Sequence, residues 1–302
     1  MGFVGLKRRG SAIAAIAIAA IGIAVPVWAG ERLPEASEIA QTPAQLQAID
    51  RLNQGLQLVQ ASRVPAAIVA FRQAIQLDPF LAPAHYNLGL ALRQLGQLQP
   101  AGDAFVAAIR VDPEFALAYA NLGALMLETN NLEQATVYLE RAIKLDDELG
   151  VAYYNLGLVQ AQQGLTEEAI DTLQTATRYS PNAPEPAYHL GRLYVLEGNT
   201  RRAKAAFRAA IDINPRYAEA HYQLGATLLT EGELEDALDA FRQAVEVAPS
   251  YANAYYGAGL AFIGLNRPSE ALRVLEYARQ LYRTQNNPQW VDRTEQLIQQ
   301  IR

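Results

Sequence analysis

The sequence Tyr86-Asn87-Leu88-Gly89 returns unchanged as Tyr154-Asn155-Leu156-Gly157, two repeat periods further along the chain. Both copies end in a glycine, and glycine recurs without insertion at every thirty-fourth position: Gly55, Gly89, Gly123, Gly157, Gly191, Gly225 and Gly259. A fixed period of this length over seven successive units indicates a repeat architecture rather than a single globular core.

Other positions keep the same phase relative to these glycines. Alanine stands at the twelfth and nineteenth positions after each of them, and Phe or Leu stands at the sixteenth. Apolar residues recur at three- and four-residue spacing, which predicts two amphipathic helices per unit, at about residues 83–95 and 100–111 in the second. Between the two helices of a unit, residues that accept a left-handed conformation predict tight turns. They are Gly96, Asn130, Gly164, Gly198, Gly232 and Asn266.

This period and pattern resemble the tetratricopeptide repeat family over about residues 48–285. The resemblance implies an all-α fold, a right-handed helical-repeat solenoid of seven units over residues 44–285. Residues 286–302 then form a C-terminal capping helix, because Trp290, Leu297 and Ile301 share one apolar stripe with a polar back.

Proline ends the second helix of most units, but Asp147 and Arg283 replace it in two of them. At Arg283 the chain is leaving the array. At Asp147 we expect the repeat simply to tolerate the substitution. The alternative is that the helix runs on through Glu148, which would alter the curvature or flexibility of the third-to-fourth junction.

The first residues have the parts of a secretory signal. Lys7-Arg8-Arg9 precede an apolar run over residues 12–25, and Val27 and Ala29 suit the positions before a cleavage site. We therefore expect residues 1–29 to be removed between Ala29 and Gly30, and residues 30–43 to be a tether. The alternative is an uncleaved membrane anchor. Both place the rest of the chain outside the cytoplasm, because the positive end stays inside. Thr42 and Pro43 predict a helix start, with a cap residue followed by proline in the first turn.

Composition and motifs exclude several kinds of chemistry. The chain has no cysteine, and its 25 basic and 31 acidic residues give a net charge of −6, which argues against a nucleic-acid partner. His85, His189 and His221 have no second ligand at metal spacing. No phosphate loop, dinucleotide fingerprint or nucleophile elbow occurs. We expect no metal, no cofactor and no enzymatic activity.

In the tetratricopeptide repeat family the first helix of each unit lines the concave face. The resemblance thus implies a groove whose candidate protein-binding residues are Tyr86, Arg93, Tyr154, Leu158, Tyr188, Arg192, Tyr222 and Tyr256. Four of the tyrosines, from Tyr154 to Tyr256, occupy one phase in successive units. With only Arg93 and Arg192 basic, a clamp for a terminal carboxylate is disfavoured.

These expectations converge on a monomeric, non-enzymatic scaffold that binds a peptide or protein segment in its groove. Its location would be the periplasm, the exterior of the cell or, in a photosynthetic source, the thylakoid lumen. A membrane is a partner only if the N-terminal segment is uncleaved. In that case the chain would be an inner-membrane-anchored assembly chaperone with the same groove.

Overall fold

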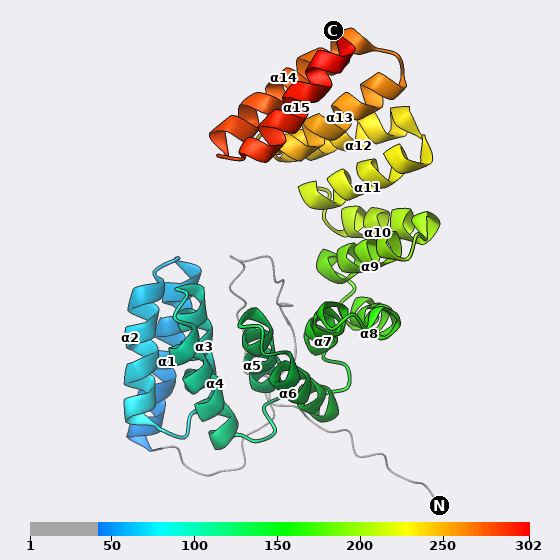
Figure 1. Ribbon diagram of the computed structural model, residues 1–302. Helices are drawn as coiled ribbons and strands as arrows, with labels where there is room; N and C mark the ends of the chain where they lie inside the picture. Colours follow the sequence, from blue (N-terminus) through cyan, green and yellow to red (C-terminus); the bar gives the residue numbers. More distant parts are fainter. Residues whose placement is uncertain (1–41) are drawn as a thin grey trace, which may run out of the picture. The chain divides into compact units, whose positions relative to one another are not determined.

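The computed structural model describes residues 42–302, which fold into fifteen α-helices without a strand among them (Figure 1). The predicted signal, the cleavage site at Ala29–Gly30 and nearly all of the tether lie outside these residues. Within residues 42–302, every helix is too short or too polar to cross a lipid bilayer. An all-α repeat fold confirms the predicted fold class.

The chain divides into two compact units, one ending at Ser180 and one spanning Pro181–Arg302. In the described part of the N-terminal unit the helices are α1 (Pro43–Gln60), α2 (Val64–Leu77), α3 (Ala82–Gln94), α4 (Leu98–Val111), α5 (Ala116–Glu128), α6 (Leu132–Leu145), α7 (Gly150–Gln162) and α8 (Thr166–Tyr179). In the C-terminal unit they are α9 (Pro184–Leu196), α10 (Thr200–Ile213), α11 (Ala218–Glu231), α12 (Leu234–Val247), α13 (Ala252–Gly264), α14 (Pro268–Thr284) and α15 (Pro288–Ile301).

The array starts with a capping box. The Thr42 hydroxyl accepts from the Gln45 backbone N–H at 3.3 Å, and the Gln45 side chain accepts from the Thr42 N–H at 2.9 Å. Pro43 occupies the first turn of α1, where a missing N–H costs nothing. The start of the first helix is therefore where its sequence predicted it.

Each odd-numbered helix up to α13 pairs with the even-numbered helix that follows it, across a tight turn. The turn contains one residue with positive φ, as predicted at the four glycines and at Asn130 and Asn266. In the first pair Ser62 takes this conformation with φ 58°, a position that the sequence did not single out. These residues let the chain reverse within a few positions of the helix end.

The recurring glycines allow the paired helices to approach closely. A Cβ atom added at Gly89 would lie 2.6 Å from Phe105 Cε1, and one added at Gly191 would lie 2.5 Å from Phe207 Cε1. Both phenylalanines are fully buried. The large residue at the sixteenth position after each glycine thus fills the space that the absent side chain leaves, which makes this contact the centre of each pair.

The third-to-fourth junction agrees with the expectation of a tolerated substitution and not with the alternative of a longer helix. The second helix of the third unit, α6, ends at Leu145, and Asp147 lies in the turn before α7. Asp146 ends the helix instead, because its carboxylate accepts from the Glu148 N–H at 3.1 Å. Asp78 and Asp112 form the same turn at their junctions. Asp147 is therefore a tolerated substitution for proline.

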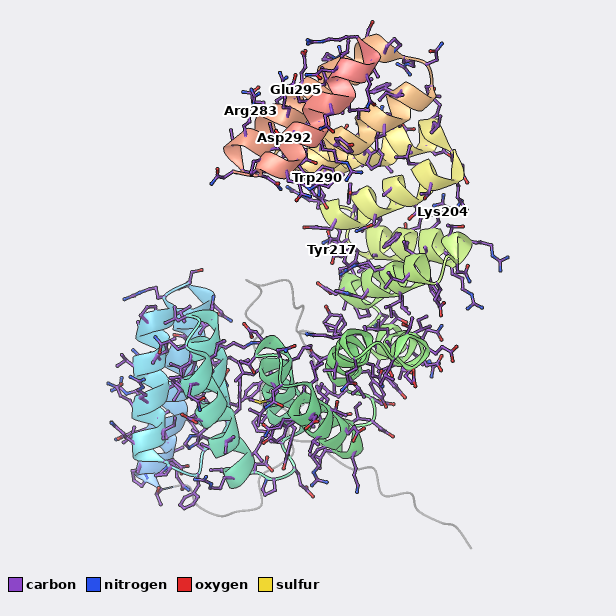
Figure 2. The ribbon with its side chains drawn as sticks, in the orientation of Figure 1. Lys204, Tyr217, Arg283, Trp290, Asp292 and Glu295 are labelled. Atoms are coloured by element: carbon purple, nitrogen blue, oxygen red, sulfur yellow. The ribbon has the colours of Figure 1, made fainter. Side chains whose placement is uncertain are left out.

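The last helix packs on α14. Ile298 is fully buried against Ala271 and Leu275, and Arg302 pairs with Glu276 at 2.7 Å. A second ion pair joins Arg279 of α14 to Glu295 of α15; Glu295 is labelled in Figure 2. The helix covers the apolar side of the final pair and presents a polar side to solvent.

Candidate protein-binding surface

The first helices of the C-terminal repeats form one continuous face. Helix α9 packs against α11, and α11 packs against α13. On each helix, four residues that lie on one side are half-buried or exposed. They stand six and three positions before the recurring glycine and one and four positions after it. This inner stripe comprises Glu185, Tyr188, Arg192 and Val195 on α9, Glu219, Tyr222, Ala226 and Leu229 on α11, and Asn253, Tyr256, Leu260 and Ile263 on α13.

The stripe is arranged in rows that run across the three helices. The row three before the glycines is entirely tyrosine, and the row four after them is entirely aliphatic, with Val195 44% exposed. Helical periodicity produces this arrangement, since residues separated by three, four and three positions share one side of a helix. A partner that binds this surface would thus meet an aromatic row and an aliphatic row side by side.

Neighbouring rings brace two of the tyrosines from both sides. The Tyr188 ring lies 6.0 Å from Phe207 of its own repeat and 5.0 Å from Tyr217, which precedes the next first helix. Tyr222 repeats this arrangement, at 6.0 Å from Phe241 and 5.1 Å from Tyr251. Tyr217 and Tyr251 were not among the predicted residues, although an aromatic residue recurs eight positions before the glycine and is a signal for them.

At the end of the row, Trp290 of α15 takes the place of the next ring. Its ring lies 5.2 Å from Tyr256 and 5.5 Å from Tyr282. Trp290 stands one full repeat period after Tyr256, so it continues the phase of the tyrosines. Tyr217 and Trp290 are labelled in Figure 2 at the start of α11 and on α15. The capping helix therefore extends the aromatic row as well as closing the core.

The tyrosine hydroxyls of this cluster are protonated at physiological pH, as those of ordinary tyrosines are, and their surroundings raise the pKa values of two of them further. Burial raises the pKa of Tyr251, and the nearby Tyr222, Tyr188 and Glu219 raise it further. Burial likewise raises the pKa of Tyr282, whose hydroxyl donates to Asn253 Oδ1 at 2.7 Å. The cluster therefore presents neutral hydrogen-bonding hydroxyls at physiological pH rather than phenolates.

One cation stands over the row. The Arg192 guanidinium lies 5.9 Å from the centre of the Tyr188 ring, a cation–π contact. Burial, together with the charge of Arg192, lowers the pKa of the adjacent His189 to about 4. His189 is therefore neutral near pH 7, and Arg192 is the cation that this part of the surface offers to a ligand.

The N-terminal unit does not offer the same surface at its candidate residues. Tyr86 is only 2% exposed, packs against Phe115 and accepts a hydrogen bond from Asn121. Tyr154 is 7% exposed. Both rings have been covered by packing, which corrects the expectation that they face a ligand. Leu158 stays half-buried.

Arg93 also departs from its expected role. Its Nε lies 2.9 Å from Glu128 Oε2, in a salt bridge between the first helices of the second and third repeats. An arginine held by a carboxylate of its own chain has little charge left for a ligand. We therefore leave Tyr86, Arg93 and Tyr154 out of the candidate surface, and retain Tyr188, Arg192, Tyr222 and Tyr256.

One exposed apolar residue of this region, Leu196, was not predicted. Leu196 ends α9 and is 78% exposed. The other repeats have Gln, Glu, Thr or Gly at this position, five after the glycine, so a comparison of phases would have found it. Leu196 follows Val195 and stands one helical turn after Arg192, which widens the apolar end of the inner stripe.

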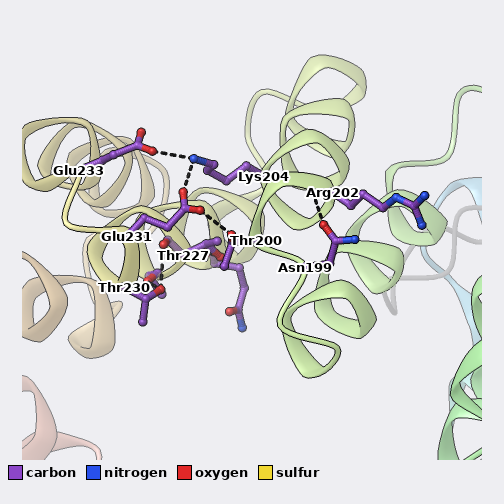
Figure 3. Close-up of polar contacts among 10 residues, drawn as sticks. Asn199, Thr200, Arg202, Lys204, Thr227, Thr230, Glu231 and Glu233 are labelled. Carbon is purple, nitrogen blue, oxygen red and sulfur yellow. Dashed lines mark hydrogen bonds and ion pairs between the residues drawn. The ribbon is translucent and has the colours of Figure 1, made fainter.

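A polar cluster away from this face joins α10 to the α11–α12 turn (Figure 3). The Lys204 ammonium pairs with Glu231 and lies 2.6 Å from Glu233 Oε1, and these hydrogen bonds raise the pKa of Lys204. The Thr200 hydroxyl donates to Glu231. All three charges are satisfied by one another, so the cluster serves to hold successive repeats together.

The histidines serve the fold as well. The His85 and His221 rings each lie within hydrogen-bonding distance, 2.9 Å, of a backbone carbonyl six residues earlier, Pro79 and Pro215 respectively. In the same phase Tyr153 donates to the Asp147 carbonyl at 3.1 Å. The part of the chain that the structure describes contains no grouping of His, Asp and Glu side chains suited to a metal ion.

Sequence profiles described as tetratricopeptide repeat or TPR repeat match residues 55–96, 82–115, 116–149, 151–183, 188–249 and 227–286. No curated protein matches the chain. Among solved structures, YrrB, described as a TPR protein with an unusual peptide-binding site, is 29% identical with a TM-score of 0.54. The match covers 65% of this chain and 99% of YrrB.

Two further structures share the fold at lower identity. PilF of Pseudomonas aeruginosa is 20% identical with a TM-score of 0.63, over 70% of this chain and 97% of PilF. PilW, described as a type IV pilus biogenesis factor, is 18% identical with a TM-score of 0.61. The match covers 68% of this chain and 94% of PilW. With the repeat profiles matching most of the described residues, the chain belongs to the tetratricopeptide repeat family and is a protein-interaction scaffold by its fold.

Proposed function

We propose that this chain is a non-enzymatic scaffold outside the cytoplasm that binds an extended segment of a partner protein on the inner stripe of its C-terminal unit. The segment is apolar or mildly basic. It is held by contacts along its length rather than by its terminal carboxylate, since Arg192 is the one basic residue of the stripe.

The observation that carries the proposal is the row of half-buried tyrosines on adjacent helices. Rings that neighbouring aromatic residues hold in place lose little conformational entropy on binding, and Tyr combines an apolar face with a hydroxyl for a ligand backbone. The resemblance to YrrB supports peptide recognition by this type of array. Residues of this kind often dominate the binding energy of interfaces.

Panning a display library of random peptides against the full-length protein tests the proposal. We expect enriched peptides to bind in fluorescence anisotropy titrations, and Val195→Asp to weaken them about ten-fold, since it places a charge in the aliphatic row. Tyr222→Ala should weaken binding by about 2 kcal/mol if its ring is a hot spot. Because Tyr222 also packs on Phe241, its helical content and melting temperature are measured in parallel.

Val137→Asp is the matched control, because Val137 is 62% exposed on α6, a second helix of the N-terminal unit. It introduces the same charge on the same type of side chain away from the stripe. Equal affinity for the wild type, Val195→Asp and Val137→Asp would refute the inner stripe as the binding surface. Failure to enrich any peptide would argue against segment binding altogether.

A further inference from the structure

We infer that the segment bound by the inner stripe is proline-rich, adopts the polyproline II conformation and carries an arginine or lysine beside the tyrosine row. This inference rests on the proposed function and specifies the chemistry of its ligand. It follows from the spacing of the row, the properties of its rings and the charge at its edge.

The spacing of the row favours polyproline II over a β-strand. Packed helices lie about 8–10 Å apart, and a polyproline II helix advances about 3.1 Å per residue with three residues per turn, or about 9 Å per turn. One turn of ligand therefore spans one repeat. Every third residue of polyproline II points the same way, whereas residues three apart on a β-strand point to opposite faces.

A ligand of this form would present the same side to Tyr188, Tyr222 and Tyr256 in turn. Each of these rings is half-buried, and Trp290 continues their phase by one further step. Aromatic-lined grooves are the known means by which proteins recognise this conformation, in which the prolines pack against the rings. A strand of the same length would place alternate side chains away from the row.

Hydrogen bonding suits the same ligand. A polyproline II segment makes no internal hydrogen bonds, so its carbonyl oxygens seek donors from solvent or a partner. Tyr251, which is half-buried against Tyr222, has a protonated hydroxyl beside the row, whereas the buried Tyr282 hydroxyl already donates to Asn253. Phenolic hydroxyls supply donors without charge, and a proline-rich backbone has few N–H groups that would need acceptors in return.

The negative charge beside the tyrosine row favours a ligand with a basic residue at that position. The Glu219 carboxylate is exposed in the first turn of α11, three residues before Tyr222, and its charge contributes to the raised pKa values of Tyr188 and Tyr251. Glu185 occupies the same phase one repeat earlier. Arg192 lies on the other side of Tyr188 along α9, so the acidic edge is confined to the starts of α9 and α11.

The same phase in the N-terminal unit lacks these features. Its residues are Leu52, Tyr86, Ala120 and Tyr154, all of them buried. An alanine interrupts the row, and the remaining rings are covered. The affinity for a proline-rich segment should therefore depend on residues of the C-terminal unit. Substitutions of exposed residues in the N-terminal unit should leave it unchanged.

Fluorescence anisotropy with three labelled peptides and the full-length protein tests the inference. The first has proline at every third position and one arginine at its end, the second has the same composition with the proline period broken, and the third carries glutamate in place of arginine. We expect the first to bind about ten-fold more tightly than either of the others, because only it meets both the period and the acidic edge.

Glu219→Lys tests the acidic edge directly. It should weaken the arginine peptide about ten-fold and strengthen the glutamate peptide. Glu133→Lys is the matched control, because Glu133 is an exposed glutamate in the first turn of α6, so the change in charge and helix-end electrostatics is the same. The control should leave the affinity for all three peptides unchanged.

The outcomes separate this inference from the function on which it rests. If library peptides without a proline period bind, and Val195→Asp weakens them, the scaffold function stands and the proline-rich ligand is overturned. Equal affinity for the periodic and the broken-period peptides would likewise overturn the proline-rich ligand and leave the scaffold function standing. If no peptide of any composition responds to Val195→Asp, both proposals fail.

Discussion

At the scale of single residues, glycine has two different roles in this chain. Gly164, with φ 81°, stands in a turn where an added Cβ would meet nothing within 4 Å, so its backbone conformation is what the position requires. Gly191 lies inside α9, where the requirement is space for Phe207. The first role follows from local chain geometry and the second from contact between helices.

The second role predicts the effect of Gly191→Ala. Its Cβ would lie 2.5, 2.6 and 2.9 Å from three Phe207 ring atoms, so the ring or the helix must move. Overpacking of this kind costs about 1–3 kcal/mol, partly offset by up to about 1 kcal/mol from the better helix propensity of alanine. We expect a net loss of about 1–2 kcal/mol in urea denaturation.

Gly102→Ala serves as its control, because Gly102 is also buried within a helix. There a Cβ would meet only Leu125 Cδ2 at 3.2 Å, the end of a flexible side chain. We expect stability to stay equal or rise by up to about 1 kcal/mol. Equal losses for the two variants would show that the close approach at Gly191 is unimportant.

At the scale of elements, the repeat junctions are determined by a short polar turn more than by proline. Asp146 caps α6 in the absence of proline, and its N–H donates to the Ala142 carbonyl at 2.9 Å. The next residue, Asp147, occupies the position that five other repeats fill with proline. The second helix of a repeat therefore ends at the same position of the repeat whether or not a proline follows it.

We expect Asp147→Pro to raise the free energy of unfolding by about 0.4–1 kcal/mol. Proline restricts the unfolded chain, and the other repeats accept proline at this position. Asp146→Pro should instead be destabilising by more than this, since φ there is −143° and its N–H bond would be lost. Thermal unfolding of both variants checks the pair. A lower melting temperature for Asp147→Pro would mean that the third-to-fourth junction differs from the others.

The capping helix is the second element that yields a prediction. Ile298 is fully buried between α15 and α14, so Ile298→Ala should cost about 2–5 kcal/mol through lost contacts and a cavity. Deleting residues 288–302 should lower stability further and promote association, because Leu275 and its neighbours would meet water. Calorimetry and light scattering measure the two effects. Unchanged melting of a monomeric truncated protein would contradict a capping role.

At the scale of the whole molecule, the two compact units differ in what their first helices expose. The tyrosine phase is buried in the unit that ends at Ser180 and half-buried in the unit of residues 181–302. The repeats therefore share one pattern of buried glycine and large residues while the exposure of their first helices differs. Location outside the cytoplasm is a separate proposal, which rests on the sequence of the segment that ends at Ala29.

Cleavage after Ala29 would remove three basic residues and no acidic one, leaving 22 basic and 31 acidic residues and a net charge of −9. We expect intact-mass measurement of the protein from its native cells to show Gly30 at the N-terminus, because Val27 and Ala29 suit a signal peptidase. Recovery of an intact Met1–Ala29 segment in the membrane fraction would favour the anchored assembly chaperone instead.

The sequence alone determined the repeat, its period, the turns and the first cap. These features depend on residues close together along the chain: Thr42 with Gln45, Asn130 with its own backbone, and Gly89 with Phe105 sixteen positions later. Local propensity and helical periodicity fix such relations, so a repeated pattern predicts them seven times over. At the end of α6 the sequence left a longer helix open as an alternative, because the proline is absent there and the Asp146 turn that ends the helix was not recognised.

Only the tertiary structure decided which residues of the predicted surface are available. Tyr86 and Tyr222 share a phase, yet Asn121 and Phe115 of the next repeat cover Tyr86, while Tyr222 keeps part of its ring in solvent. Arg93 is neutralised by Glu128, 35 residues away. Burial and ion pairing at these positions are set by side chains of neighbouring repeats, and the identity of a residue within its own repeat carries no information about them.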